Sequence, residues 1–142
     1  LVQPDKAFFG LKDYQQYSII RELVKMSKMN IEIIGMPTIR ESDGLAMSSR
    51  NRLLNEKERN QAVTLIQLLN KTKSDYASKE ITELKFEFET ELAKHPEFRL
   101  DYFEIADGKT LQPLIDKTSE EPRAFVAAFL GKVRLIDNVS LR

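Results

Sequence analysis

The side chains best suited to chemistry lie in one polar stretch, residues 37–52, between an apolar run and a segment with helical periodicity. The stretch carries two adjacent hydroxyls and three guanidinium groups, which belong to Ser48, Ser49, Arg40, Arg50 and Arg52. Guanidinium forks and small hydroxyls bind phosphate oxygens and can follow charge that moves during a reaction. The stretch therefore predicts a polyphosphate site, although the same composition is also typical of a solvated surface loop.

A second polar cluster follows the first apolar run of the chain. Gly10, Lys12 and Asp13 stand where a predicted strand meets a predicted helix, and Gln16 lies one helical turn later. A glycine lets a ribose approach the backbone, a carboxylate accepts hydrogen bonds from ribose hydroxyls, and a lysine can reach phosphate. The cluster predicts a nucleotide site; the alternative is that Asp13 only caps the helix while the glutamine faces solvent.

Two strands and one helix are expected to position these clusters. A strand within residues 1–10 precedes a helix from Asp13 to about residue 28, where apolar residues recur at helical spacing. Residues 31–36 are short, β-branched and apolar, as in a parallel strand that is covered on both faces. Ligands bind beyond the carboxyl ends of strands in such units, and both clusters follow carboxyl ends. We therefore expect the clusters to face one crevice.

The chain is expected to be α/β and to contain two domains. Two strands and one helix leave sheet edges and faces without partners, so residues 1–52 are predicted to be the second half of a Rossmann-like ATP-binding domain. Residues 53–142 are predicted to form a small α+β domain of two helices and an antiparallel sheet. Its expected elements are helices over residues 56–70 and from 81 up to 96, and strands over 100–106, 123–130 and 133–136.

The composition argues against several classes of function. The 142 residues include 22 basic and 22 acidic side chains, so no global charge draws the chain to nucleic acid or to an anionic membrane. With no cysteine and one histidine, thiolate, zinc and histidine-triad chemistry are not expected. No transmembrane or signal-peptide pattern is present, so we expect a cytoplasmic protein. The ligand must be recognised by local groups.

Three long motifs resemble one known family. They are PDKAFFGLKDYQQ at residues 4–16, RESDGLAMSSRNRL at 40–53 and GKVRLIDN at 131–138. In this order they resemble the C-terminal half of pantothenate synthetases, the pantoate-beta-alanine ligases. The resemblance implies ATP-dependent condensation of pantoate with beta-alanine through a pantoyl adenylate, which yields pantothenate, AMP and pyrophosphate. The alternative is an isolated nucleotide-binding module without turnover of its own.

The resemblance also implies roles for residues around the nucleoside and the acid substrate. Gly10 and Asp13 would hold the ribose of ATP. Ile39 and Met47 would contact its adenine. Gln16 matches the glutamine that binds pantoate in the family.

Four further residues are implied to hold the phosphates and to act in catalysis: Lys12, Ser48, Ser49 and Arg50. No metal ligand is identified in this chain, and the resemblance implies that the ligands of Mg²⁺ lie in the N-terminal half of the family protein. That half would be the main partner of this chain, which is expected to be inactive alone, and a homodimer of the full-length enzyme is also considered.

Residues 53–142 are expected to act as a lid over ATP. The loop before them is expected to be anchored only by the strand that precedes it and the helix that follows it.

Overall fold

The computed structural model describes residues 3–142, and the chain divides into two compact units between Ile39 and Arg40. We predicted the domain boundary at residues 52 and 53. The division falls earlier because the loop that begins at Arg40 packs on the second unit. Leu45 lies in the core of that unit, and Arg40 forms an ion pair with Asp137 on its last strand.

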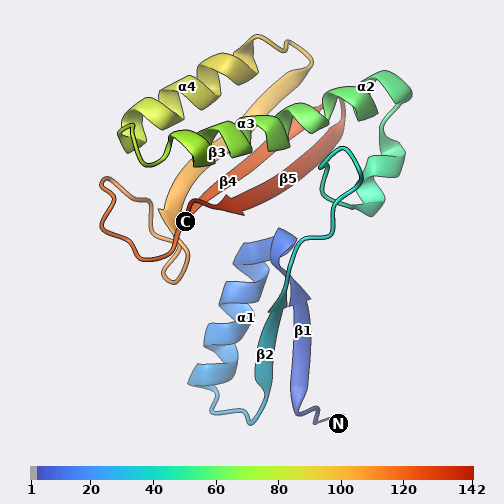
Figure 1. Ribbon diagram of the computed structural model, residues 1–142. Helices are drawn as coiled ribbons and strands as arrows, with labels where there is room; N and C mark the ends of the chain where they lie inside the picture. The colour runs from blue at the N-terminus through green and yellow to red at the C-terminus, as the bar shows by residue number, and fades with distance from the viewer. Residues whose placement is uncertain (1–2) are drawn as a thin grey trace. The chain divides into compact units, whose positions relative to one another are not determined.

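The first unit is a strand-helix-strand arrangement (Figure 1). Strands β1 (Lys6–Gly10) and β2 (Glu32–Met36) form a parallel pair along their full lengths. A short 3₁₀ helix, η1 (Leu11–Asp13), leads directly into α1 (Tyr14–Met26), which packs against both strands. The predicted order of elements and the parallel pairing are confirmed.

A glycine in β2 allows the helical segments to lie close to the sheet. A Cβ atom built on Gly35 would lie 2.7 Å from the Leu11 side chain and 3.2 Å from the Tyr17 ring. Real Cβ atoms essentially never approach other atoms within 3.0 Å. The missing side chain therefore lets η1 and α1 pack directly on the strand.

The sheet of the first unit is less buried than we predicted. The central side chains of β2 are only half-buried, and Phe8 of β1 is 63% exposed. Ile19 and Leu23 of α1 are also exposed. The sequence predicted a strand covered on both faces, but within the first unit α1 is the helix that packs on the sheet, and it covers one face.

The second unit places helices on one face of an antiparallel sheet. Its strands are β3 (Phe98–Asp107), β4 (Pro122–Leu130) and β5 (Val133–Ser140), in the order β3-β4-β5. Helices α3 (Val63–Asp75) and α4 (Ile81–Ala93) lie side by side across this sheet, as Figure 1 shows. Helix α3 contacts β4 and β5, whereas α4 contacts β3.

The main hydrophobic core lies between these helices and the sheet. The rings of Phe88 on α4 and Phe103 on β3 stack with their centroids 3.7 Å apart. Leu69 of α3 and Ile105 of β3 are both 0% exposed. Because apolar burial is the dominant favourable contribution to folding, this core holds β5 and α3 in place as supports for the loop that precedes them.

The helix predicted over residues 56–70 is divided in two. Asn55 forms the predicted capping box with Glu58, with both hydrogen bonds 2.9 Å long, and α2 (Glu56–Gln61) follows. At Ala62 the backbone tightens, since the Leu65 N–H donates to the Ala62 carbonyl three residues earlier. Helix α3 then continues beyond the predicted end. The second unit, all of which is described, therefore has three α-helices where two were predicted.

Strand β5 is longer than the predicted 133–136, because residues 137–140 also pair with β4, and two polar residues among them are buried with partners. Asp137 pairs with Arg40, and the Asn138 Oδ1 accepts a hydrogen bond of 2.6 Å from Arg123. The turn that joins β4 to β5 lies at the predicted place, where Gly131 adopts a positive φ of 57°. The predicted antiparallel sheet is confirmed, with a longer last strand.

The core predicts a large loss of stability for Leu69→Ala. Removing a fully buried isobutyl group leaves a cavity and should lower the free energy of unfolding by about 2–5 kcal/mol. Urea denaturation measures this change. Ile115→Ala is the control, since that side chain is 91% exposed, and its unfolding midpoint should match that of the unchanged chain. Equal midpoints for both variants would contradict the assigned core.

The connection after β3 predicts a pH-dependent contribution to stability. The Asp107 carboxylate accepts hydrogen bonds from the Ser119 hydroxyl at 2.6 Å and from two backbone N–H groups, and these bonds lower its pKa from 3.8 to about 2. The stabilisation should be fully present above about pH 4 and lost as the pH falls toward the lowered pKa.

A carboxyl-detected NMR titration follows this ionisation directly. Ser119→Ala removes the largest cause of the shift, so the pKa of Asp107 should rise toward its ordinary value. An unchanged titration in that variant would contradict the assignment.

Candidate functional site

Four candidate residues follow one another at the carboxyl end of β1. Gly10 is the last residue of that strand, Lys12 and Asp13 lie in η1, and Gln16 lies in the first turn of α1. No atom beyond the chain neighbours lies within 4 Å of a Cβ built on Gly10, so the space beside this backbone is open. The structure thus brings this predicted cluster together as one short surface of the first unit.

The structure does not support helix capping as the role of Asp13. The residue occupies the N-cap position of α1, but its side chain makes no capping hydrogen bond. Its side chain and that of Gln16 are exposed, whereas Lys12 is half-buried. An exposed carboxylate beside an open backbone can accept hydrogen bonds from a ligand's hydroxyls.

Ile39 belongs to the same end of the first unit. Gly10 pairs with Met36 at the carboxyl end of the two strands, and Ile39 follows three residues later. Its side chain is 71% exposed. An exposed aliphatic group at this position is available to pack against a flat ring.

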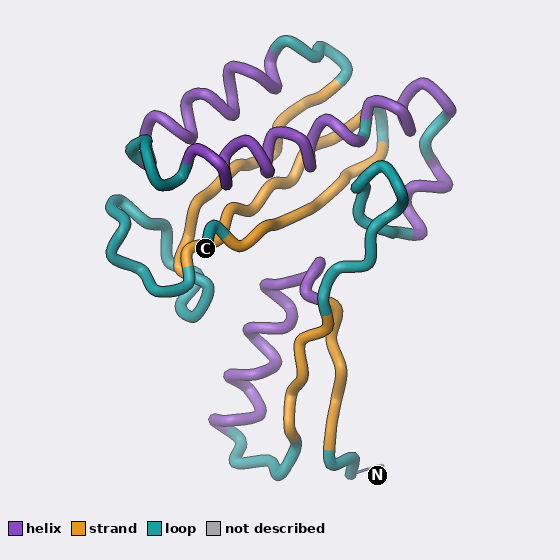
Figure 2. The backbone as a smooth tube through the Cα atoms, in the orientation of Figure 1, coloured by secondary structure: helices purple, strands orange, loops and turns teal. Residues whose placement is uncertain are grey.

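The other four candidates lie in the second unit, in the loop and the 3₁₀ helix that follow Arg40 (Figure 2). Met47 is 51% exposed, and helix η2 (Ser49–Leu53) begins two residues later. The Ser48 Oγ accepts a hydrogen bond of 3.2 Å from the Arg50 backbone N–H. The Ser48 hydroxyl proton can still be donated, and the side chains of Ser49 and Arg50 are exposed.

This loop has more anchors than we predicted. Asp43 accepts a hydrogen bond of 2.7 Å from Arg59 on α2, which lowers the pKa of Asp43 and raises that of Arg59. The Asp43 carboxylate also accepts from the Leu45 N–H, and Leu45 is buried in the core. Gly44 between them has a φ of 92°, which favours glycine. The expectation that only the flanking elements hold the loop was wrong, because its own side chains bind the second unit.

One of the three guanidinium groups of the loop is already engaged within the protein. Arg40 donates two hydrogen bonds to Asp137, of 2.7 and 3.0 Å. Sequence reasoning counted Arg40 among the groups suited to phosphate and missed this partner. The available signal was the polar pair Asp137-Asn138, which stands between the apolar residues Ile136 and Val139. Arg50 and Arg52 have exposed side chains and remain the phosphate-binding candidates among these arginines.

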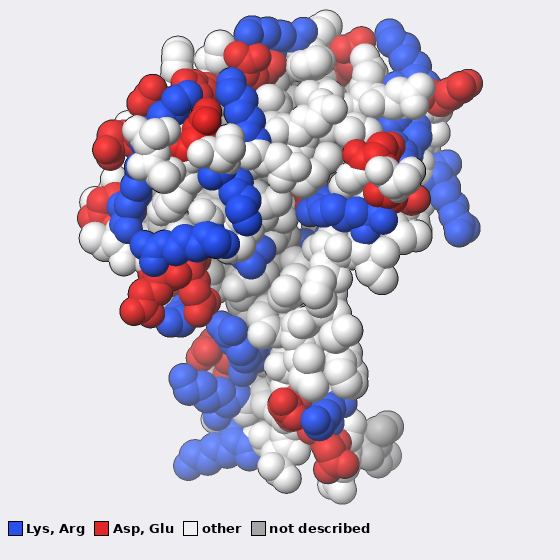
Figure 3. Space-filling view, viewed as in Figure 1, with Lys and Arg blue, Asp and Glu red and all other residues white. Residues whose placement is uncertain are grey.

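The surface charge is mixed, in keeping with local recognition of a ligand. On the face seen in Figure 3, basic and acidic side chains are interspersed over the second unit. Within residues 3–142, no group of three or more His, Cys, Asp or Glu side chains could hold a metal ion. None of the helices formed by these residues combines the length and apolar character needed to cross a membrane.

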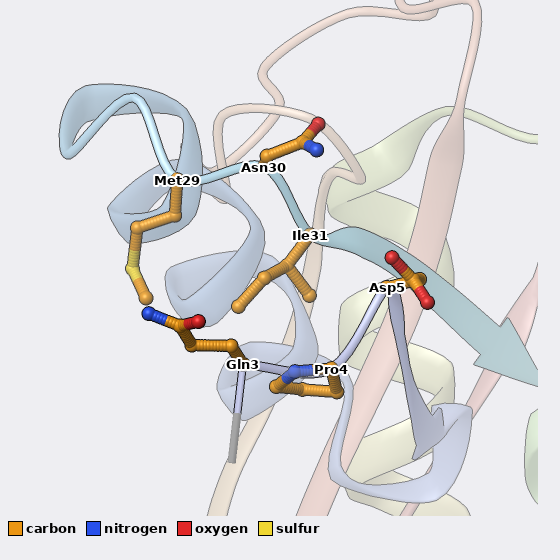
Figure 4. A pocket seen from close by; sticks show the side chains of 6 residues that line it. All are labelled: Gln3, Pro4, Asp5, Met29, Asn30 and Ile31. Carbon is orange, nitrogen blue, oxygen red and sulfur yellow. The ribbon is translucent and has the colours of Figure 1, made fainter. Parts of the chain in front are cut away.

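A hollow of about 490 Å³ lies at the opposite end of the parallel strands (Figure 4). It is lined by Gln3, Pro4, Asp5, Met29, Asn30 and Ile31. These residues precede β1 and β2, whereas the candidate cluster follows the carboxyl end of β1. The hollow is therefore separate from the predicted nucleotide site.

Comparison with known proteins identifies close relatives over almost the whole chain. The sequence model of the family described as pantoate-beta-alanine ligase matches residues 1–140. A pantothenate synthetase of Bacteroides thetaiotaomicron is 44% identical over 145 residues, covering 99% of this chain and 50% of the relative. A pantothenate synthetase of Magnetococcus marinus is 46% identical over 143 residues, covering 99% of this chain and 49% of the relative. The chain thus spans about half the length of the curated relatives it matches.

Solved structures agree with this result. Pantothenate synthetase from Thermus thermophilus is 39% identical, with a TM-score of 0.93 over 99% of this chain and 51% of that one. A pantoate-beta-alanine ligase from Francisella tularensis, complexed with beta-gamma ATP and beta-alanine, is 31% identical, with a TM-score of 0.59 over 98% of this chain and 44% of that one. The family match and these likenesses converge, and the chain belongs to the pantoate-beta-alanine ligase family.

Proposed function

We propose that this chain is the C-terminal portion of an AMP-forming ligase that condenses pantoate with beta-alanine to pantothenate. The observation that carries the proposal is the family match across residues 1–140. Further support comes from the Francisella tularensis relative, whose complex contains beta-gamma ATP and beta-alanine. In this proposal residues 1–52 are the second half of a Rossmann-like ATP-binding domain, and residues 53–142 are a lid over ATP.

The cluster at the end of β1 would bind ATP and pantoate. The open space beside Gly10 leaves room for the ribose, and the exposed Asp13 carboxylate can accept hydrogen bonds from its hydroxyls. Lys12 would hold the phosphates. Gln16, one helical turn further, would donate to pantoate.

Further residues are proposed to bind ATP, namely Ile39 at the end of the first unit and four residues in the loop of the second unit. The exposed side chains of Ile39 and Met47 are suited to pack against adenine. The hydroxyls of Ser48 and Ser49 and the Arg50 guanidinium would bind the phosphates, because charged donors form short hydrogen bonds to phosphate oxygens.

The chemistry needs two displacements and no nucleophile from the protein. A carboxylate oxygen of pantoate attacks the α-phosphorus of ATP, the bond from that phosphorus to the bridging oxygen breaks, and pyrophosphate leaves. The beta-alanine amine then attacks the acyl carbon of pantoyl adenylate, loses a proton and displaces AMP. Negative charge builds on the leaving pyrophosphate in the first step, so fixed cations such as Lys12 and Arg50 would lower its barrier.

The remaining half of the ligase would supply further groups. Among residues 3–142, no cluster of at least three His, Cys, Asp or Glu side chains is present to hold a metal ion. The proposal therefore keeps the predicted ligands of Mg²⁺ in the other half of the ligase. A cytoplasmic location and a homodimer of the full-length enzyme are part of the same proposal.

The direct test uses the full-length protein with ATP, pantoate and beta-alanine. Release of AMP that depends on both pantoate and beta-alanine would support the proposed reaction. Failure to form AMP under these conditions would overturn it.

The proposed role of Lys12 predicts that its replacement greatly slows adenylate formation. In the full-length protein, Lys12→Ala should lower the rate of adenylate formation by about a hundredfold or more, the range for loss of one preorganised donor. Pyrophosphate release in a single turnover measures this rate. Lys25→Ala is the matched control, because that lysine lies in the last turn of α1 and is 79% exposed, and its rate should stay normal. Near-normal adenylation by the Lys12 variant would remove Lys12 from the mechanism.

The 142-residue chain by itself should bind ATP with a Kd above the micromolar range and should form no pantothenate. It spans about half of its relatives, and each loss of about 1.4 kcal/mol of contact lowers affinity about tenfold. Titration calorimetry with ATP and an assay for pantothenate check both statements. Micromolar binding, or turnover by the chain alone, would contradict them.

A further inference from the structure

An ion pair inside the second unit joins the first residue of the loop to the last strand. The Nη1 of Arg40 donates to Asp137 Oδ2 at 2.7 Å, and its Nη2 donates to Oδ1 at 3.0 Å. The Asp137 side chain is 5% exposed and that of Arg40 is 25% exposed. Two parallel bonds largely shielded from water fix the orientation of the guanidinium plane as well as its position.

Hydrogen bonds continue from this pair toward the predicted phosphate-binding residues. Arg40 Nη1 also donates to the Gly44 carbonyl at 3.0 Å, and the backbones of Arg40 and Ala46 form an antiparallel bridge. The Asn51 Nδ2 donates to the Ala46 carbonyl at 3.1 Å, and the Asn51 backbone N–H donates to the Ser48 carbonyl at 3.1 Å. The contacts that begin at β5 therefore reach both ends of the segment 47–50.

We infer that Arg40 and Asp137 are positioning residues that hold this segment ready for the phosphates of ATP. The inference rests on the proposed function and adds two residues to it. Asp137 provides a fixed point on the sheet, and Arg40 connects that point to the backbone on either side of the Gly44 turn. Groups held in place before the substrate arrives stabilise developing charge without reorganisation during the reaction.

The first test is Arg40→Lys in the full-length protein. Lysine keeps the positive charge but lacks the planar fork, so the pair should lose its fixed geometry. We expect kcat for adenylate formation to fall about tenfold or more, because small misplacements of reacting groups are costly, while KM for pantoate changes less than about twofold.

Arg134→Lys is the matched control. Like Asp137, Arg134 lies on β5. It donates two hydrogen bonds, of 3.0 and 2.8 Å, to Asp101, which belongs to β3 rather than to the loop. Its kcat should stay within about twofold of the unchanged protein, as expected for an exposed ion pair.

A second measurement does not depend on activity. Amide hydrogen exchange across residues 47–51, without nucleotide, should be at least about tenfold faster in Arg40→Lys and unchanged in Arg134→Lys. Asp137→Asn should reproduce the effect of Arg40→Lys. The variant with both changes should lose little more of its kcat for adenylate formation than either single variant, since the effects of residues that act as one unit are not additive.

The outcomes separate this inference from the proposed function. If the unchanged protein forms no adenylate, the proposed function fails, and the exchange rates still decide whether the pair holds the segment. Unchanged exchange over residues 47–51 overturns the inference. The inference is also overturned if the loss of activity merely follows the unfolded fraction in thermal denaturation. Additive losses of kcat in the double variant overturn it as well.

Discussion

A carboxylate buried in the sheet of the second unit has to be paired, and this requirement organises the loop. An unpaired buried charge costs several kcal/mol, so Asp137 needs a cation close by. That cation comes from Arg40, which lies 97 residues away in the sequence. The ion pair with Asp137 on β5 therefore holds the start of the loop against the second unit. The serines and Arg50 then belong to the body that carries the antiparallel sheet.

Local pattern predicted most elements but not all of their ends. Helical spacing identified α1 and α4, the capping pair at Asn55 and Glu58 identified α2, and β-branched residues identified β2. The end of β5 was missed because a strand normally stops at adjacent polar residues. Asp137 and Asn138 continue it by pairing with β4, while Arg40 and Arg123 reach their side chains from elsewhere in the fold. A short window of sequence shows the polar pair but does not identify its partners.

The candidate site shows the same division between local and distant information. The neighbourhood of Gly10 and Asp13 was predictable, because residue order alone places them between a strand and a helix. Arg40 and Arg50 look alike in the sequence, yet the first is engaged by a buried carboxylate and the second is exposed. Only the tertiary structure distinguishes a guanidinium that shapes the loop from one that can meet a ligand. The roles of the exposed residues in binding ATP remain proposals.

The apolar side chains that the first unit leaves exposed affect how the chain behaves as a solute. Phe8 on the sheet and Ile19 and Leu23 on α1 are each more than half exposed. The formal net charge of the chain is zero at pH 7, so electrostatic repulsion between copies is weak. Two strands with open edges offer further backbone groups for pairing. The smaller unit thus contributes to association of separate chains, and a buffer away from neutral pH favours dispersed molecules.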